Sequence, residues 1–400
     1  MRPTEFLKHW RDIAFRALYP DFKPLEVPVM VFDGADTWLF GSVQAPDGFA
    51  REKEWFRCGG RFDLVTANTA ANGMALVMEG DPLEAAYIAA HEAFHVFQTQ
   101  RFPHWGANEV EALTYPTTDV QGLLERRLET VALHRAIEDM DAAWAVEALH
   151  WREQRYQRLS ASAAIYEREL ERYEGLAFFV ELNARGLKHR LPAADFPAED
   201  VRRRTYATGQ AVARLLEYWQ PDYTAAVEHR YLDQLLSEVV ESHQRKPLEP
   251  DLIAAQLERA AFEIEQILLE KSQLKELALG SAALLLEVTT HEPLFPQGFD
   301  PMNLRVLFEN EVLHTRFLQL GNASGSLELL SLSAITRGSD RHPLFNGVGH
   351  VTIALHELPI IVENGETLEL HAQGFKLRFS GAKLERAAKI WRVRLEQSFA

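Results

Sequence analysis

The sequence predicts an α+β protein: a mainly helical domain that carries a small mixed sheet near its N-terminus, followed by an all-β domain. Three patterns indicate this class. Short β-rich runs separated by Gly, Asp and Asn fill residues 26–80. Apolar residues recur every three to four positions from residue 82 to about 275, and regularly spaced short β-type runs follow. We therefore place one domain at 1–275 and an antiparallel β domain at 276–400.

Length and charge narrow the possible functions. A chain of 400 residues is too long for one ordinary core, so more than one domain is expected. With 47% hydrophobic and 25% charged residues, the composition is that of a globular protein. The net charge of −16 argues against binding to nucleic acid or to an anionic membrane by charge alone. We interpret the densest basic cluster, VRRRT at 201–205, as a solvated helix start.

The single cysteine and the N-terminus indicate the compartment. Cys58 is the only cysteine, so the chain forms no intramolecular disulfide and offers no cysteine-based zinc site. Residues 1–20 alternate charged with apolar side chains, which predicts an amphipathic helix rather than a signal peptide. No apolar run approaches the roughly 18 residues that a membrane span needs. We expect a cytoplasmic protein with no membrane segment.

The elements follow from local patterns. The runs VPVMVFDG, TWLFGSV, EWFRCGGRFDLVTAN and GMALVME predict the small sheet. The next helix should begin after Asp81, a suitable N-cap, with Pro82 at its first position. Apolar spacing predicts further helices at 118–148, 151–186, 203–219, 224–243 and 251–275. Short runs joined by Gly, Asn and Pro after residue 276 predict an antiparallel sandwich or barrel.

The first of these helices carries a metal-binding motif. Residues 91–95, His-Glu-Ala-Phe-His, match the pattern H-E-x-x-H. Side chains four apart lie on one helix face, so His91 and His95 converge on one point, as two zinc ligands must. Glu92 is offset toward the open side of the metal, where it can act as a general base. The alternative is a helix with two ordinary histidines and a surface glutamate.

Catalytic zinc sites typically have three protein ligands, so a third is needed. The longer pattern H-E-x-x-H-x-x-G-x-x-H fails, because Gln98 occupies its glycine position and Arg101 its last histidine position. The search therefore moves to carboxylates on later helices. Glu174, in the segment Glu-Gly-Leu-Ala, has small neighbours that allow two helices to approach closely.

Other carboxylates compete with Glu174. Glu171 lies one turn earlier and could replace it. Glu181 lies two turns later, where it could orient a histidine or remain a surface residue. Glu125 and Glu129 are nearer to the motif in sequence, and we interpret them as partners of arginines on a solvated helix.

The pair HEAFH and YEGLAFFVE resembles the gluzincin metallopeptidases, including the M1-like aminopeptidases and the broader peptidase MA-like group. In several of those families, the third ligand is the Glu of an E-G-x-A segment. The resemblance covers about residues 60–220 and rests on short motifs. It implies a zincin-like domain, a zinc ion held by His91, His95 and Glu174, and Glu92 as the general base.

The chain also departs from that pattern. A long segment, residues 96–173, separates His95 from Glu174, and we interpret residues 118–166 as an inserted helical hairpin. The segment NGMALVMEG does not match the G-x-M-E-N strand with which M1 enzymes bind a free amine. The chain thus resembles a divergent peptidase MA-like protein rather than a true M1 enzyme, and an aminopeptidase specificity is not implied.

Gluzincins usually add a Tyr or His that stabilises the oxyanion of the tetrahedral intermediate. We nominate Tyr206, because Gly209 close by allows close backbone approach, with Tyr115 as the alternative. For both tyrosines, a place at the edge of the core with a satisfied hydroxyl remains the competing interpretation.

Three functional hypotheses remain. The first is a zinc peptidase that cleaves a peptide or protein substrate by means of a metal-activated water and Glu92. The second is a non-catalytic binding or regulatory protein on a zincin scaffold. The third is a metal-dependent hydrolase of another amide or ester.

Overall fold

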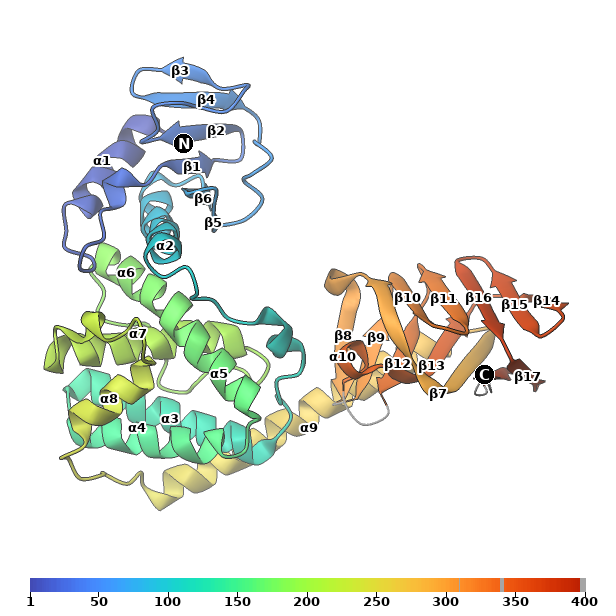
Figure 1. Ribbon diagram of the computed structural model, residues 1–400. Helices are drawn as coiled ribbons and strands as arrows, with labels where there is room; N and C mark the ends of the chain where they lie inside the picture. Colours follow the sequence, from blue (N-terminus) through green and yellow to red (C-terminus); the bar gives the residue numbers. More distant parts are fainter. Residues whose placement is uncertain (309, 339–341, 396–400) are drawn as a thin grey trace. The chain divides into compact units, whose positions relative to one another are not determined.

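The computed structural model describes residues 1–308, 310–338 and 342–395 (Figure 1). The predicted α+β class is confirmed: a small mixed sheet comes first, helices fill the middle of the chain, and a β domain follows. The chain forms two compact units, Met1–Ala261 and Phe262–Ala400, and the long helix α9 (Pro250–Gly280) contains the point of division. In the described residues, no helix is both long enough and apolar enough to cross a membrane.

The first unit begins with helix α1 (Pro3–Ala14) and a six-stranded sheet of order β3-β4-β2-β1-β6-β5. Strands β1 and β6 pair in parallel, and the other neighbours pair antiparallel, so the sheet is mixed. Met30, Leu39 and Leu76 of the central strands form a buried core together with Val65. The strands are β1 (Val29–Phe32), β2 (Asp36–Phe40), β3 (Ala50–Glu52), β4 (Trp55–Gly59), β5 (Thr69–Ala71) and β6 (Met74–Met78).

Helix α2 (Pro82–Arg101) starts where the sequence predicts. The Asp81 carboxylate accepts hydrogen bonds from the backbone N–H groups of Leu83 and Glu84, at 3.0 and 2.9 Å, and Pro82 occupies the first helical position. The helix packs against α1, β6 and α6 (Leu176–Arg185), and residues 91–96 are buried. The sheet and α1 therefore fix the helix that carries the H-E-x-x-H motif.

Two of the predicted helices are interrupted. The segment 118–148 breaks at Met140, which adopts a left-handed conformation (φ 51°), and Asp141 then caps a new helix. The segment 151–186 breaks before Ser160, whose hydroxyl caps the next helix. The helices that follow α2 are α3 (Val120–Asp139), α4 (Ala142–Tyr156), α5 (Ala161–Leu170), α6 (Leu176–Arg185), α7 (Val201–Trp219) and α8 (Leu232–Val240). Short 3₁₀ turns lie at Pro24–Glu26, Glu109–Leu113 and Tyr223–Ala225.

The second unit is a β domain built around β7 (Leu284–Phe299). The first half of β7 pairs with β13 and its second half with β10, so this one strand belongs to both halves of the sheet. Leucine, valine and phenylalanine side chains from both halves share one buried core. The predicted antiparallel pairing holds along the path β14-β15-β16-β11-β10-β7-β13-β12-β9-β8, whereas β18 joins β7 in parallel.

The remaining strands of this unit are short. They are β8 (Leu304–Phe308), β9 (Glu311–His314), β10 (Phe317–Asn322), β11 (Gly325–Leu330), β12 (Ala334–Gly338), β13 (Val348–Leu355), β14 (Ile360–Asn364), β15 (Thr367–Ala372), β16 (Phe375–Ser380), β17 (Ala382–Arg386) and β18 (Ile390–Leu395). A 3₁₀ turn, Pro301–Asn303, precedes β8, and the four-residue helix α10 (Pro343–Asn346) precedes β13.

Candidate metal centre

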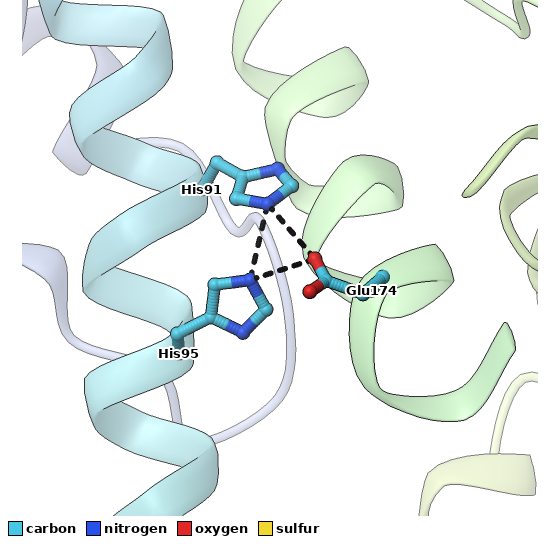
Figure 2. A group of neighbouring side chains, drawn as sticks. All are labelled: His91, His95 and Glu174. Carbon is cyan, nitrogen blue, oxygen red and sulfur yellow. Dashed lines mark hydrogen bonds and ion pairs between the residues drawn. The ribbon is translucent and has the colours of Figure 1, made fainter. Parts of the chain in front are cut away.

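His91 and His95 meet on one face of α2 (Figure 2). Their Nε2 atoms lie 3.1 Å apart, and both side chains are buried. This is the convergence expected for residues four apart on a helix. Both imidazoles point toward the segment that carries Glu174.

Glu174 reaches the histidines from a π-helical turn, Glu171–Gly175, which joins α5 to α6. Such turns occur often at functional sites. The carboxylate oxygen Oε2 of Glu174 lies 3.1 Å from His95 Nε2 and 3.6 Å from His91 Nε2. Three donor atoms from two helical segments thus form a compact triangle.

The dimensions of this triangle suit a zinc ion. With bonds of 2.0–2.1 Å and tetrahedral angles, neighbouring donor atoms lie about 3.3 Å apart. The three observed separations, 3.1, 3.1 and 3.6 Å, span that value. Within the described part of the chain, this is the only group of three or more His, Cys, Asp or Glu side chains close enough to hold a metal ion together.

Hydrogen bonds assign the protons on the two rings. The Gln98 amide N–H donates to the Tyr173 carbonyl oxygen at 2.8 Å, so the amide oxygen faces His95 Nδ1, also at 2.8 Å. Nδ1 of His95 therefore carries the proton, and Nε2 presents a lone pair. Nδ1 of His91 lies 3.3 Å from Glu181 Oε2, although the two groups are not aligned for a hydrogen bond. The carboxylate still favours a proton on Nδ1 of His91, as in His95.

Two imidazole Nε2 atoms and one carboxylate oxygen therefore face one another, an arrangement that a shared cation, either a metal ion or a proton, stabilises. Burial alone would lower the pKa of His91, but the contacts with Glu174 and Glu181 outweigh burial and raise it to about 10. Burial would raise the pKa of Glu174, yet the two histidines hold it well below its usual range. The donor set thus stabilises positive charge, which is the property that a metal site needs.

Glu92 lies beside this group with its carboxylate unengaged. Its side chain is 6% exposed, and no described residue donates a hydrogen bond to it. Burial raises the pKa of Glu92, while the nearby histidines oppose the shift. A buried carboxylate with free lone pairs next to a metal site is suited to take a proton from water.

The two candidate tyrosines lie in different surroundings. The Tyr206 ring stacks on His91, with centroids 6.0 Å apart, and burial and the charge of Glu174 raise the pKa of its hydroxyl. The Tyr115 hydroxyl instead donates to Glu167 and accepts from Arg155 at 3.3 Å, inside a buried ion network. Of these two tyrosines, Tyr206 is therefore the one beside the candidate ligands.

The competing glutamates are engaged elsewhere. Glu171 accepts hydrogen bonds from Arg152 and from Thr208, and does not join the triangle. Glu125 pairs with Arg158. The prediction that Glu125 and Glu129 lie on a solvated helix is wrong, because most of α3 is buried. Glu129 is 1% exposed, and its arginine partners come from α4 and α7.

The basic cluster VRRRT also differs from the prediction of a solvated helix start. Arg204 is fully buried and pairs with Glu129 and Asp195. Arg202 reaches Glu174, with its Nη2 atom 2.6 Å from Oε1. Arg202 and Arg203 have exposed side chains, as expected, and Arg203 pairs with Asp200 of the same helix start.

Sequence reasoning missed three residues that contact the candidate ligands directly: Gln98, Arg202 and Tyr173, whose ring stacks on His95 with centroids 4.4 Å apart. Gln98 could have been found, because it follows His95 by three positions and so lies on the same helix face. Arg202 gave no sequence signal, since its contact with Glu174 depends on how α7 crosses the π-helical turn. In comparisons with known proteins, no family model, curated protein or solved structure matches this chain.

Proposed function

We propose that this protein is a zinc-dependent peptidase of the gluzincin type, with His91, His95 and Glu174 as metal ligands and Glu92 as general base. The observation that carries the proposal is the triangle of three donor atoms, 3.1 to 3.6 Å apart, beside an unengaged buried carboxylate. A structural metal site needs no such base, so Glu92 favours hydrolysis over a purely structural metal.

Each residue has a distinct part in the proposed chemistry. A zinc ion held by His91, His95 and Glu174 would supply a Lewis acid and lower the pKa of a nearby water toward neutrality. Glu92 accepts the proton of the attacking water and passes it to the leaving amine. Tyr206, whose hydroxyl stays protonated because its pKa is raised, donates a hydrogen bond to the oxyanion that forms on the substrate.

The sheet supports a peptide as substrate. Strand β5 is the edge of the six-stranded sheet and packs against α2, the helix of the motif. An extended peptide can add to such an edge through backbone hydrogen bonds. Binding of this kind does not depend on any one side chain of the substrate. This edge distinguishes the proposal from the hydrolysis of a small amide or ester.

The test combines metal content with hydrolysis. We expect about one zinc per chain in the purified wild type and little in Glu174→Ala, measured by elemental mass spectrometry. A peptide library analysed by mass spectrometry should show cleavage by the wild type. Glu92→Gln should retain zinc and lose cleavage. The exposed Glu153 provides the matched control, because Glu153→Gln should alter neither measurement.

Any one of three results would overturn the proposal. A wild type that binds no zinc after reconstitution has no metal centre. If the wild type binds zinc but cleaves nothing in a diverse peptide library, it is not a peptidase. If Glu92→Gln keeps full activity, Glu92 is not the general base.

A further inference from the structure

Arg202 joins two carboxylates at the edge of the candidate metal centre. Its Nη2 atom lies 2.6 Å from Glu174 Oε1, and its Nη1 atom pairs with Glu109 of the 3₁₀ turn Glu109–Leu113. The same Nη2 group lies 3.3 Å from the Tyr206 hydroxyl, one helical turn along α7. One guanidinium therefore contacts both a candidate ligand and the candidate oxyanion residue.

The two oxygens of Glu174 have different partners. Oε2 faces the histidines at 3.1 and 3.6 Å, and Oε1 accepts the hydrogen bond from Arg202. Glu181 shows the same division: Oε2 lies 3.3 Å from His91 Nδ1, and Oε1 accepts from Arg185 Nε at 2.8 Å. In each carboxylate that contacts a histidine of the motif, the other oxygen thus accepts a hydrogen bond from an arginine.

The position of Arg202 in its helix carries an electrostatic cost. It is the second residue of α7, and the first turn of a helix disfavours positive side chains because the backbone N–H groups there already present positive charge. Its side chain is 45% exposed, so its pair with Glu109, which is also exposed, adds little to stability. The contact with the buried carboxylate of Glu174 is therefore the interaction that accounts for an arginine at this position.

We infer that Arg202 is a positioning residue that engages Glu174 Oε1 and so presents only Oε2 to the metal ion. This inference rests on the metal site of the proposed function. A carboxylate that offers one oxygen leaves room for water among the metal's ligands, whereas one that offers both fills more of the coordination shell. Arg202 would also fix the direction of Oε2 before the metal binds.

The test uses metal binding, not only hydrolysis. Arg202→Gln removes the charge and Arg202→Lys keeps it without the planar fork. Arg203→Gln is the matched control, because the neighbouring Arg203 pairs with Asp200 and not with a candidate ligand. Zinc affinity is measured for each full-length variant by competition with a chelator. The visible absorption of the cobalt(II)-substituted proteins reports the number of metal ligands, because these bands weaken as the coordination number rises.

We expect Arg202→Gln to weaken zinc binding by about 10–100-fold and to weaken the cobalt bands. Arg202→Lys should recover part of the affinity, and Arg203→Gln should match the wild type. Because the arginine is half-exposed, these variants should fold, and circular dichroism checks this. Zinc affinity within twofold of the wild type, together with an unchanged cobalt spectrum, would overturn the inference for Arg202.

The failures are distinguishable. If the wild type binds metal and Arg202→Gln binds it equally with the same spectrum, only the role of Arg202 is wrong. If Arg202→Gln alters metal binding but the wild type cleaves no peptide, Arg202 keeps its role and the peptidase proposal fails. If the wild type binds neither zinc nor cobalt, both fail.

Discussion

Gly175 and Gly209 bring the π-helical turn and α7 into backbone contact. A Cβ atom on Gly175 would lie 2.7 Å from the Cα of Gly209. A Cβ on Gly209 would lie 2.5 Å from the carbonyl oxygen of Glu171 and 2.8 Å from its Cα. These neighbours are backbone atoms and cannot rotate away. The crossing sets the distance between Glu174 on the turn and Arg202 and Tyr206 on α7.

Gly209→Ala should therefore disturb both folding and metal binding. The added methyl group must push α7 away from the turn, which we expect to cost roughly 1–3 kcal/mol of unfolding free energy. Zinc affinity should fall with it, because Glu174 moves relative to α2. Urea unfolding and chelator competition measure the two effects.

Gly106→Ala is the control for this substitution. A Cβ on Gly106 would meet no atom within 4 Å. That variant should match the wild type in both measurements. If Gly209→Ala behaves in the same way, the close crossing does not constrain the site.

Gln98→Leu should weaken metal binding although it replaces no candidate ligand. Leucine fills the space but cannot accept a hydrogen bond from His95 Nδ1 or donate one to the Tyr173 carbonyl oxygen. We expect a loss of about 10–100-fold in zinc affinity and about 1–3 kcal/mol in stability. Gln100→Leu makes the same exchange at an exposed position of α2 and should change neither quantity. Equal zinc affinities in the two variants would contradict the assigned role of Gln98.

The sequence predicts the parts of the site that depend on local rules. A helix cap at Asp81 and a four-residue spacing place His91 and His95 on one buried face, as the structure has them. The small residues after Glu174 indicate a close helix contact, and Gly175 makes one. The fold class follows in the same way from periodicity, because each segment keeps one period over many residues.

The sequence does not predict features that arise from tertiary contacts. The π-helical turn is one extra residue of winding, and no residue type specifies it. Nothing in the sequence near Glu129 indicates that it is buried. The arginines that balance its charge, Arg152, Arg155 and Arg204, are far away along the chain. The run of three arginines within residues 201–205 predicts a solvated segment, and only the packing of α7 reveals that Arg204 is buried.

His314 makes the β domain sensitive to acid. Its side chain is 1% exposed, and Nε2 lies 3.1 Å from the Thr336 hydroxyl. Burial, with a smaller effect of the nearby His342, lowers its pKa from 6.5 to about 4. The native state therefore binds fewer protons than the unfolded state between these values, so the contribution to stability is complete above pH 6.5, falls as the pH drops from 6.5 to 4, and levels off below pH 4. The full loss is about 3 kcal/mol, of which about 2 kcal/mol is lost by pH 5.

Urea unfolding at pH 7.5 and pH 5, followed by circular dichroism, measures this loss. His314→Gln keeps a hydrogen-bonding side chain that does not titrate, so its stability should fall less than that of the wild type over the same interval. His342 and His350, whose pKa values burial also lowers, add to the loss in both proteins. Equal losses in the wild type and His314→Gln would exclude His314 as the source.

Glu129 should matter far more to stability than a surface glutamate with similar contacts. Its oxygens accept paired hydrogen bonds from Arg152, at 2.9 and 2.8 Å, and from Arg155, at 3.0 and 2.7 Å. Glu129→Gln removes the carboxylate that these two buried guanidinium groups share and leaves them only Glu171 and Glu167 as counter-charges, which we expect to cost about 3–5 kcal/mol.

Glu249→Gln provides the comparison for Glu129→Gln. Glu249 accepts two hydrogen bonds from Arg135, both at 3.0 Å, but its side chain is 59% exposed, so its replacement should change stability little. Arg152 also holds Glu171 in the π-helical turn. Zinc affinity should therefore fall in Glu129→Gln and not in Glu249→Gln. A stable Glu129→Gln variant with normal zinc affinity would show that the buried ion network neither supports the fold nor places Glu174.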